Sequence, residues 1–127
     1  MPLVTLTTKK DKSIQFIDTV LNTVHNALVV SGVPEDDKFQ RVIELDAKHF
    51  KYSARYPDLP AARTDNYLLI EVLLSVGRSV KVKKQIVQQI VADIEQKLQI
   101  SSEDVMVIFI ETRWENWSFS GGRFIHT

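Results

Sequence analysis

The chain has 127 residues, of which 44% are hydrophobic and 25% charged, and these proportions fit one compact domain over residues 1–127. Sixteen basic residues balance sixteen acidic ones, so no global field would attract nucleic acid or an anionic membrane. Cysteine is absent and no stretch reaches the ~20 apolar residues that cross a bilayer, so we expect a cytoplasmic protein without disulfides, thiolate chemistry, a signal peptide or a membrane span.

The first half of the chain predicts a strand, a helix and a second strand. Residues 2–8 (PLVTLTT) are β-branched or apolar, which favours a short strand. Ser13 is a suitable N-cap for a helix that ends at Gly32, and apolar residues at steps of three and four mark its buried face. These residues are Ile14, Ile17, Leu21, Val24 and Leu28. A polar turn over residues 33–37 then leads into the alternating pattern of a strand. That strand contains Phe39, Arg41, Ile43 and Leu45.

The second half repeats this plan. An apolar run over residues 67–76 suits a central strand, and Gly77-Arg78-Ser79 turns into a second helix. The buried face of that helix is predicted to contain Ile86, Ile90, Ile94 and Leu98. An acidic turn over residues 101–104 and a strand over residues 105–111 complete the repeat. The pseudo-repeats therefore span residues 2–45 and 67–111. Between them lies a polar linker, residues 46–66, in which residues 49–52 (HFKY) form a possible short strand. An aromatic tail follows, residues 112–127.

These elements predict an α+β fold made of two β-α-β repeats. Each unit should join parallel strands by a right-handed crossover, which gives a four-stranded mixed sheet with both helices on one face. If a pseudo-two-fold axis relates the halves, the first and third strands are antiparallel neighbours. The starts of the first two strands and the ends of the last two then meet along one edge of the sheet, the edge that is formed by strand termini and not by an outer strand. Pro2, Asp37, Arg78 and the tail with Trp117 and Phe119 should converge there.

Five segments, in this order and spacing, carry a family resemblance over nearly the whole chain. They are Met1-Pro2-Leu3-Val4, VPEDDKFQ (33–40), GRS (77–79), SSEDV (101–105) and ENWSF (115–119). Together they resemble the tautomerase superfamily, and more narrowly the branch that contains malonate semialdehyde decarboxylase. The resemblance implies a tautomerase/MIF-like fold, a free N-terminal proline as acid or base and, for chains with two repeats, a homotrimer.

Carried over by position, the resemblance assigns roles to three residues. Pro2 matches the catalytic proline, provided that Met1 is removed, because an amide nitrogen cannot act as a base. Arg78 matches an arginine that binds a substrate carboxylate, and a planar guanidinium suits such a group. Asp37 matches an acid that assists carbonyl or water chemistry. Each residue also has a purely structural interpretation. Pro2 can simply start a strand, Arg78 can be a solvated residue at the start of a helix, and Asp37 can be a carboxylate that stabilises a turn. Where the decarboxylase pattern has a second arginine, this sequence has Val80.

Trp117 and Phe119 match aromatic positions that form the wall of the substrate pocket, although ordinary packing explains them equally well. The three histidines, His25, His49 and His126, show no ligand spacing, so we expect no metal and no cofactor.

The expected function is a tautomerase-type isomerisation in which the Pro2 amine transfers a proton on a small carboxylate-bearing oxo or enol compound. One alternative is a decarboxylase-like or hydratase activity with protonated Pro2. A second alternative is a trimeric scaffold or binding protein without catalysis.

Overall fold

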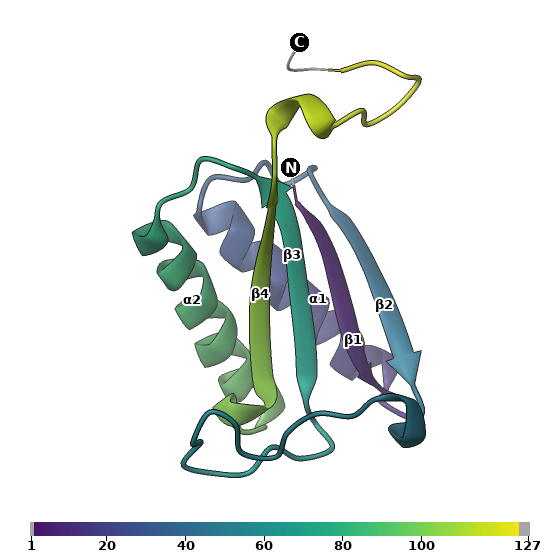
Figure 1. The fold of residues 1–127 in the computed structure, drawn as a ribbon, viewed down its shortest axis with the longest axis vertical. Helices are drawn as coiled ribbons and strands as arrows, with labels where there is room; N and C mark the ends of the chain where they lie inside the picture. Colours follow the sequence, from purple (N-terminus) through teal and green to yellow (C-terminus); the bar gives the residue numbers. More distant parts are fainter. Residues whose placement is uncertain (1, 125–127) are drawn as a thin grey trace.

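The computed structural model describes residues 2–124, so Met1 and residues 125–127 of the expected tail, with His126, lie outside the described part. A four-stranded sheet in the order β2-β1-β3-β4 forms its centre. The strands are β1 (Leu3–Lys9), β2 (Phe39–Leu45), β3 (Leu68–Ser75) and β4 (Val105–Thr112). β1 runs parallel to β2 and β3 parallel to β4, while β1 and β3 are antiparallel neighbours (Figure 1). The mixed sheet predicted from the two repeats is confirmed.

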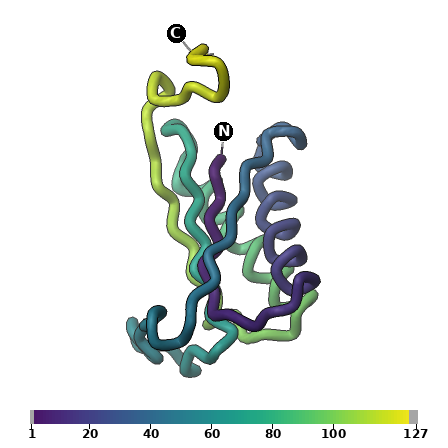
Figure 2. Tube along the Cα trace, turned by 90° about the vertical axis from the view of Figure 1, so that its right-hand side faces the viewer, coloured from purple at the N-terminus to yellow at the C-terminus, as the bar shows by residue number. Residues whose placement is uncertain are grey.

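Two helices, α1 (Ile14–Val30) and α2 (Val80–Leu98), cover one face of the sheet (Figure 2). Both begin at a serine whose hydroxyl accepts a hydrogen bond from the third residue after it, Ser13 from Phe16 N and Ser79 from Val82 N. These caps satisfy backbone donors that have no partner inside a helix. Within the described residues, neither helix has the length and apolarity that a membrane span needs.

The core lies between the two helices and the sheet. Alternate residues of β1 and β3 point toward the helices, because successive side chains of a strand face opposite sides. The fully buried core residues are Val4, Leu6, Val20, Val24, Leu28, Leu68, Ile70, Val72, Leu74, Ile86, Ile90 and Ile94. The expectation that Ile14 is buried is wrong, since its side chain is 75% exposed. The packed face of α1 begins later, with Phe16 and Ile17 against the core.

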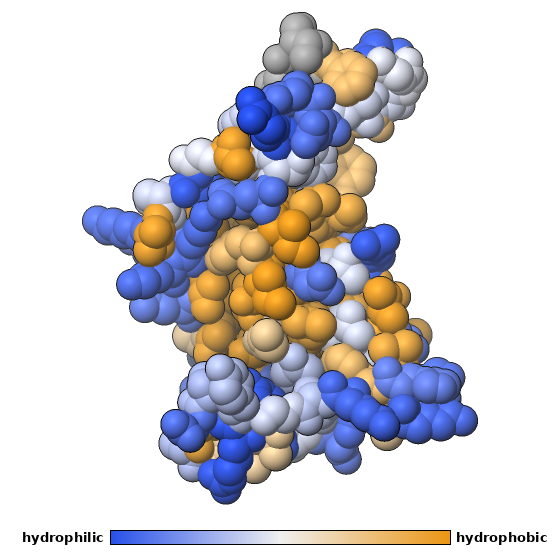
Figure 3. Space-filling model, viewed as in Figure 1, coloured by the Kyte–Doolittle hydropathy of each residue, from blue (hydrophilic) through white to orange (hydrophobic). Residues whose placement is uncertain are grey.

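The other face of the sheet is open and largely apolar. Large hydrophobic residues of β2 and β4 remain partly exposed on it, with Phe39 at 47%, Ile43 at 40% and Ile110 at 42%. Met106 and Ile108 continue the same row of β4. This face is turned toward the viewer in Figure 3, where apolar surface spans the middle of the molecule. An exposed apolar surface of this kind normally marks an interaction site.

Three short 3₁₀ helices occupy the connections: η1 (Ala47–His49), η2 (Ser102–Asp104) and η3 (Trp114–Asn116). The possible strand at residues 49–52 is wrong, because the chain leaves η1 as an irregular loop. Its aromatic rings pack on Tyr67 instead of pairing in a sheet, with ring centroids 5.5 Å away for Phe50 and 4.2 Å away for Tyr52. Ring packing therefore fixes this loop at the end of the sheet opposite to the tail.

Candidate active site

The candidate residues meet at one edge of the sheet, as the topology predicts. Leu3 pairs with Phe39 on one side and with Leu73 on the other, so the start of β1 lies between the start of β2 and the end of β3. Ser75 pairs with Thr112, which brings the end of β4 to the same edge. The connection before β2, the turn before α2 and the tail all lie at this edge, at the top of Figure 1.

A hollow of about 320 Å³ opens at this edge. Asp37 and Arg78 both line it, although 40 residues lie between them in the sequence. The other lining residues are Gly32, Val33, Pro34, Ser75 and Trp114. The hollow therefore combines one acidic and one basic side chain with an apolar and aromatic wall, which suits a small polar ligand.

Arg78 is positioned by a tight turn and by a helix cap. Gly77 has a φ of 125°, a conformation that favours glycine, and Ser79 then caps α2. The Arg78 side chain is half-buried, and within residues 2–124 its guanidinium makes one hydrogen bond, from Nη1 to Ser75 O at 3.4 Å. Because a guanidinium carries five N–H donors, most of them can serve a bound carboxylate.

The first turn of α2 adds positive potential beside Arg78. It contains no acidic residue, and its amide groups carry the positive end of the helix dipole. Lys83 is neutralised by Glu111, with Nζ and Oε1 2.8 Å apart, whereas Lys81 and Lys84 are exposed to solvent. Arg78 is therefore the basic side chain of this turn that faces the hollow, and an anion is the ligand that the local charge favours.

Asp37 lies in the turn between α1 and β2. Its backbone N–H donates to Pro34 O at 3.0 Å, which closes the turn, and Lys38 N donates to Asp36 O at 2.9 Å. Its side chain is half-buried and its Oδ1 is buried. Glu35 and Asp36, the neighbouring acids, are exposed. The fold thus selects Asp37 out of three consecutive acids to face the hollow.

The aromatic tail is arranged differently from the expectation. Trp117 and Phe119 stack on each other with centroids 5.5 Å apart, and Phe119 packs against Phe39 at 5.8 Å. Neither is among the residues that line the hollow, whereas Trp114 is. Trp114 is the first residue of η3, directly after β4. The sequence contained a signal for Trp114, because this residue closely follows the last predicted strand, which ends at this edge of the sheet.

Pro2 lies at the same edge but is not among the lining residues of the hollow. It directly precedes β1, and its side chain is buried. No group of three or more histidine and acidic side chains suited to a metal ion occurs within residues 2–124. The described geometry thus unites Asp37, Arg78 and Trp114 in one hollow and places Pro2 at the same edge of the sheet.

Comparison with known sequences decides the family. The sequence model described as "Tautomerase enzyme" matches residues 37–120, which is more than half of the chain. The chain belongs to this tautomerase family. The match includes Asp37, Arg78, Trp114, Trp117 and Phe119, while Pro2 precedes it.

Several solved structures have the same fold as this member of the family. One malonate semialdehyde decarboxylase, studied for its decarboxylase and hydratase activities, is 26% identical over 95% of this chain and 92% of its own, with a TM-score of 0.86. A second malonate semialdehyde decarboxylase, inhibited by 3-bromopropiolate, is 24% identical over 95% and 91%, also at 0.86. A fused 4-OT, a symmetric trimer, is 19% identical over 96% and 94%, at 0.76. The chain is thus an enzyme of the tautomerase fold, and its relatives include a decarboxylase.

Proposed function

We propose that this protein, as a single cytoplasmic domain, uses the amine of Pro2 to move a proton on a small carboxylate-bearing oxo or enol compound, after removal of Met1. The observation that supports this most is the shared edge: the start of β1, Asp37 and Arg78 come together from distant parts of the sequence. In this reaction Arg78 holds the substrate carboxylate. The result is an isomerisation that needs no cofactor.

The mechanism follows from what each group can do. A secondary amine is ordinarily protonated at neutral pH, and burial or a nearby cation shifts it toward the neutral form that can act as a base. Pro2 is buried at an edge that also carries Arg78. The neutral amine removes a proton from the carbon next to the carbonyl, and the guanidinium stabilises the enolate that develops. The proton then returns at another atom, with Trp114, and with Trp117 and Phe119 behind it, limiting access of water.

A second candidate activity is decarboxylation or hydration with a protonated Pro2. The similarity to malonate semialdehyde decarboxylase favours it, and among the structures of that enzyme is a variant of its first-residue proline. In this case the ammonium polarises a carbonyl and Asp37 assists. Val80, which is 67% exposed at the start of α2, stands where a second arginine would bind. Its apolar side chain favours isomerisation over decarboxylation.

Kinetics of matched variants test the proposal. With phenylpyruvate as the assayed enol acid, Pro2→Ala should lower kcat/KM by about 100-fold or more, the usual contribution of a general base. Arg78→Ala should lower it through weaker carboxylate binding, while Lys81→Ala, an exposed cation of the same helical turn, should stay within about twofold. The pH–rate profile of the wild type should rise as the amine loses its proton. Equal rates for the wild type and Pro2→Ala would defeat the base role.

We also infer that three copies assemble through the open face of the sheet. Its exposed apolar residues, among them Phe39, Ile108 and Ile110, form a surface that water disfavours (Figure 3). Two-repeat proteins of this fold, the fused 4-OT forms, occur as trimers. In a trimer, contact with the open faces of the two other copies would bury these side chains.

A further inference from the structure

The pseudo-two-fold axis of the sheet gives the candidate active site a counterpart at the opposite edge. Ser13 and Ser79 cap the two helices in the same way. The residue before each cap is basic, Lys12 in the first repeat and Arg78 in the second. One position earlier, Asp11 (φ 76°) and Gly77 both adopt a positive φ. Lys12 is therefore the structural equivalent of Arg78.

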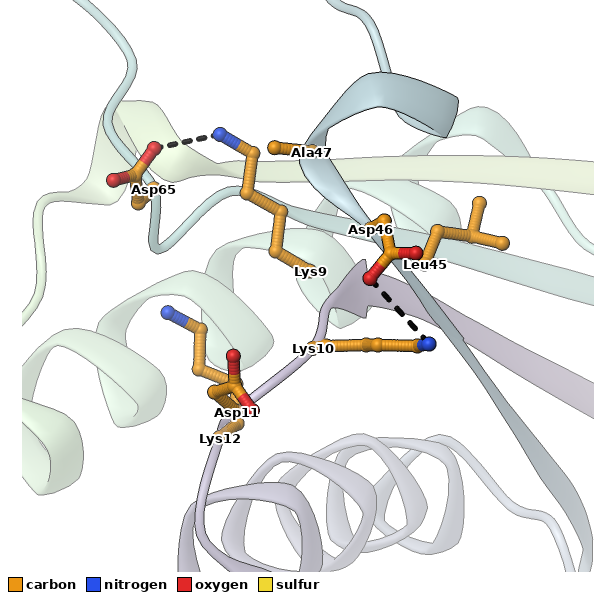
Figure 4. A pocket seen from close by; sticks show the side chains of 8 residues that line it. All are labelled: Lys9, Lys10, Asp11, Lys12, Leu45, Asp46, Ala47 and Asp65. Carbon is orange, nitrogen blue, oxygen red and sulfur yellow. Dashed lines mark hydrogen bonds and ion pairs between the residues drawn. The ribbon is translucent and has the colours of Figure 1, made fainter.

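A second hollow lies at this opposite edge, and its volume is also about 320 Å³ (Figure 4). Three of its lining residues, Lys12 among them, correspond by position to lining residues of the first hollow. Lys9 and Ser75 are the last residues of β1 and β3, and each lines its own hollow. Ala47 and Trp114, the first residues of η1 and η3, also correspond. The two hollows therefore share the end of a strand, the residue before a helix cap and the start of a 3₁₀ helix, and the residue before the cap is a cation in both.

The second hollow lacks both groups that the proposed reaction needs. Lys9 and Ser75 are 66 positions apart, and the same offset takes Pro2 to Leu68, whose nitrogen is a peptide amide inside the chain. Asp37 corresponds to Asp104, the last residue of η2, which is buried. The Asp104 carboxylate accepts hydrogen bonds from Thr64 N and Thr64 Oγ1, both at 2.6 Å. Among the described residues, this edge carries lysine side chains that can bind an anion, but it has no counterpart of the Pro2 amine and no accessible equivalent of Asp37.

A carboxylate of the chain itself, that of Asp65, contacts the lysines of the second hollow. Lys9 Nζ donates to Asp65 Oδ1 at 2.6 Å (Figure 4), and Lys12 Nζ donates to Asn66 Oδ1 at 3.1 Å. The hydrogen bond from Lys9, with a further contribution from the charge of Lys12, lowers the pKa of the Asp65 carboxyl below its ordinary value. Both lysines thus stabilise a negative charge at the position of Asp65.

Asp65 is held loosely enough to be replaced. Its side chain is 87% exposed, whereas that of Lys9 is only 20% exposed. An exposed ion pair contributes little, because solvent screens it and ordering the side chain costs entropy. Lys10, the third lysine of the hollow, pairs separately with Asp46 at 3.4 Å. A ligand that offers a carboxylate to Lys9 can therefore enter when Asp65 moves into solvent.

We propose that the hollow at the opposite edge is a second, non-catalytic binding site for a small carboxylate, held by the ammonium groups of Lys9 and Lys12 in place of Asp65. The ligand class rests on the Asp65 contact and, in part, on the function proposed for Arg78. The chain then binds two molecules of one chemical class and transforms only the one beside Pro2.

An NMR titration with propionate, an unreactive carboxylate, tests this site in the full chain carrying Arg78→Ala, which silences the first hollow. Propionate should shift the backbone amides of residues 9–13 and 64–66 in a saturable way. Adding Asp65→Asn removes the competing charge and should tighten the apparent Kd about threefold to fivefold. Asp18→Asn, an exposed position on α1, makes the same charge change and should leave the Kd unaltered.

Lys12→Met in the same background should abolish the saturable shifts, while Lys97→Met, an exposed lysine in the last turn of α2, should keep them. The spectra themselves report whether each variant is folded. Unchanged binding in Lys12→Met, or equal affinities for Asp65→Asn and Asp18→Asn, would overturn the proposal. Failure of this proposal can be told apart from failure of the proposed function. If the proposed function is wrong, Pro2→Ala shows wild-type kinetics, and these titrations are not affected.

Discussion

Tyr67 is a buried phenol whose ionisation links stability to alkaline pH. Burial raises the pKa of Tyr67, and the charge of Arg63 opposes this only in part. A raised pKa means that the folded state resists deprotonation, so the stabilisation is complete below the ordinary pKa of about 10 and is lost as the pH rises through the folded value. Tyr67→Phe should therefore lose less stability than the wild type between pH 8 and pH 11.

Urea unfolding at both pH values measures this difference. At neutral pH the variant should lose only about 1 kcal/mol or less, because the removed hydrogen bond, from Tyr67 Oη to Met106 Sδ at 3.0 Å, is a weak one. Tyr56→Phe, at a position 75% exposed in the linker that precedes Tyr67, is the matched control. Identical alkaline losses for the wild type and Tyr67→Phe would contradict the burial argument.

Single residues of the site were predictable where topology fixes their place. Arg78 lies shortly after the end of β3 and Asp37 shortly before the start of β2, and strand order brings these two strand termini to one edge. Trp114 was missed because four aromatic residues crowd the tail and the turn of η3 decides which one faces the hollow. Lys12 was missed too, since residues 9–12 follow the predicted strand 2–8 and read in the sequence only as a polar break before the helix.

At the scale of elements, the two serine caps offer a matched pair. Ser13→Ala and Ser79→Ala should each lower the free energy of unfolding by about 1 kcal/mol, because each hydroxyl satisfies one backbone N–H of its helix. Only Ser79→Ala should also lower kcat/KM with phenylpyruvate, since Ser79 directly follows Arg78. Urea unfolding and steady-state kinetics on both variants check this. A loss of activity of equal size in Ser13→Ala would contradict the placement of the site at the start of α2.

Periodicity predicted the helices and strands well because each packs one regular face on a shared core. Ile86, Ile90 and Ile94 are all buried, as the spacing indicates. The linker was less predictable. Its segment 49–52 has strand-forming residues, but in the structure Phe50 and Tyr52 pack their rings on Tyr67 and the segment pairs with no strand. Whether such a segment forms a strand depends on tertiary contacts, which cannot be read from the local sequence.

At the scale of the whole molecule, the open face of the sheet is the surface through which we propose that three copies assemble. Ile108→Lys should convert this proposed trimer into monomers, because burying an unpaired ammonium at an apolar interface is costly. Ile14→Lys introduces the same charge at a position 75% exposed on α1 and should leave the trimer intact. Sedimentation velocity distinguishes the species. A wild type that sediments as a monomer, or an Ile108→Lys variant that stays trimeric, would contradict assembly through this face.

Covalent labelling of the N-terminal nitrogen tests the central claim most directly. 3-Bromopropiolate, which inhibits a malonate semialdehyde decarboxylase of this fold, combines a carboxylate for Arg78 with an electrophilic alkyne for the amine. Intact mass and peptide mapping should show that Met1 is removed and that each chain carries one adduct, on the Pro2 nitrogen. Arg78→Ala should slow the labelling about tenfold, because the variant loses one charge-assisted contact to the carboxylate of the reagent. Retained Met1, an adduct on another residue, or labelling at an equal rate in Arg78→Ala would contradict the account.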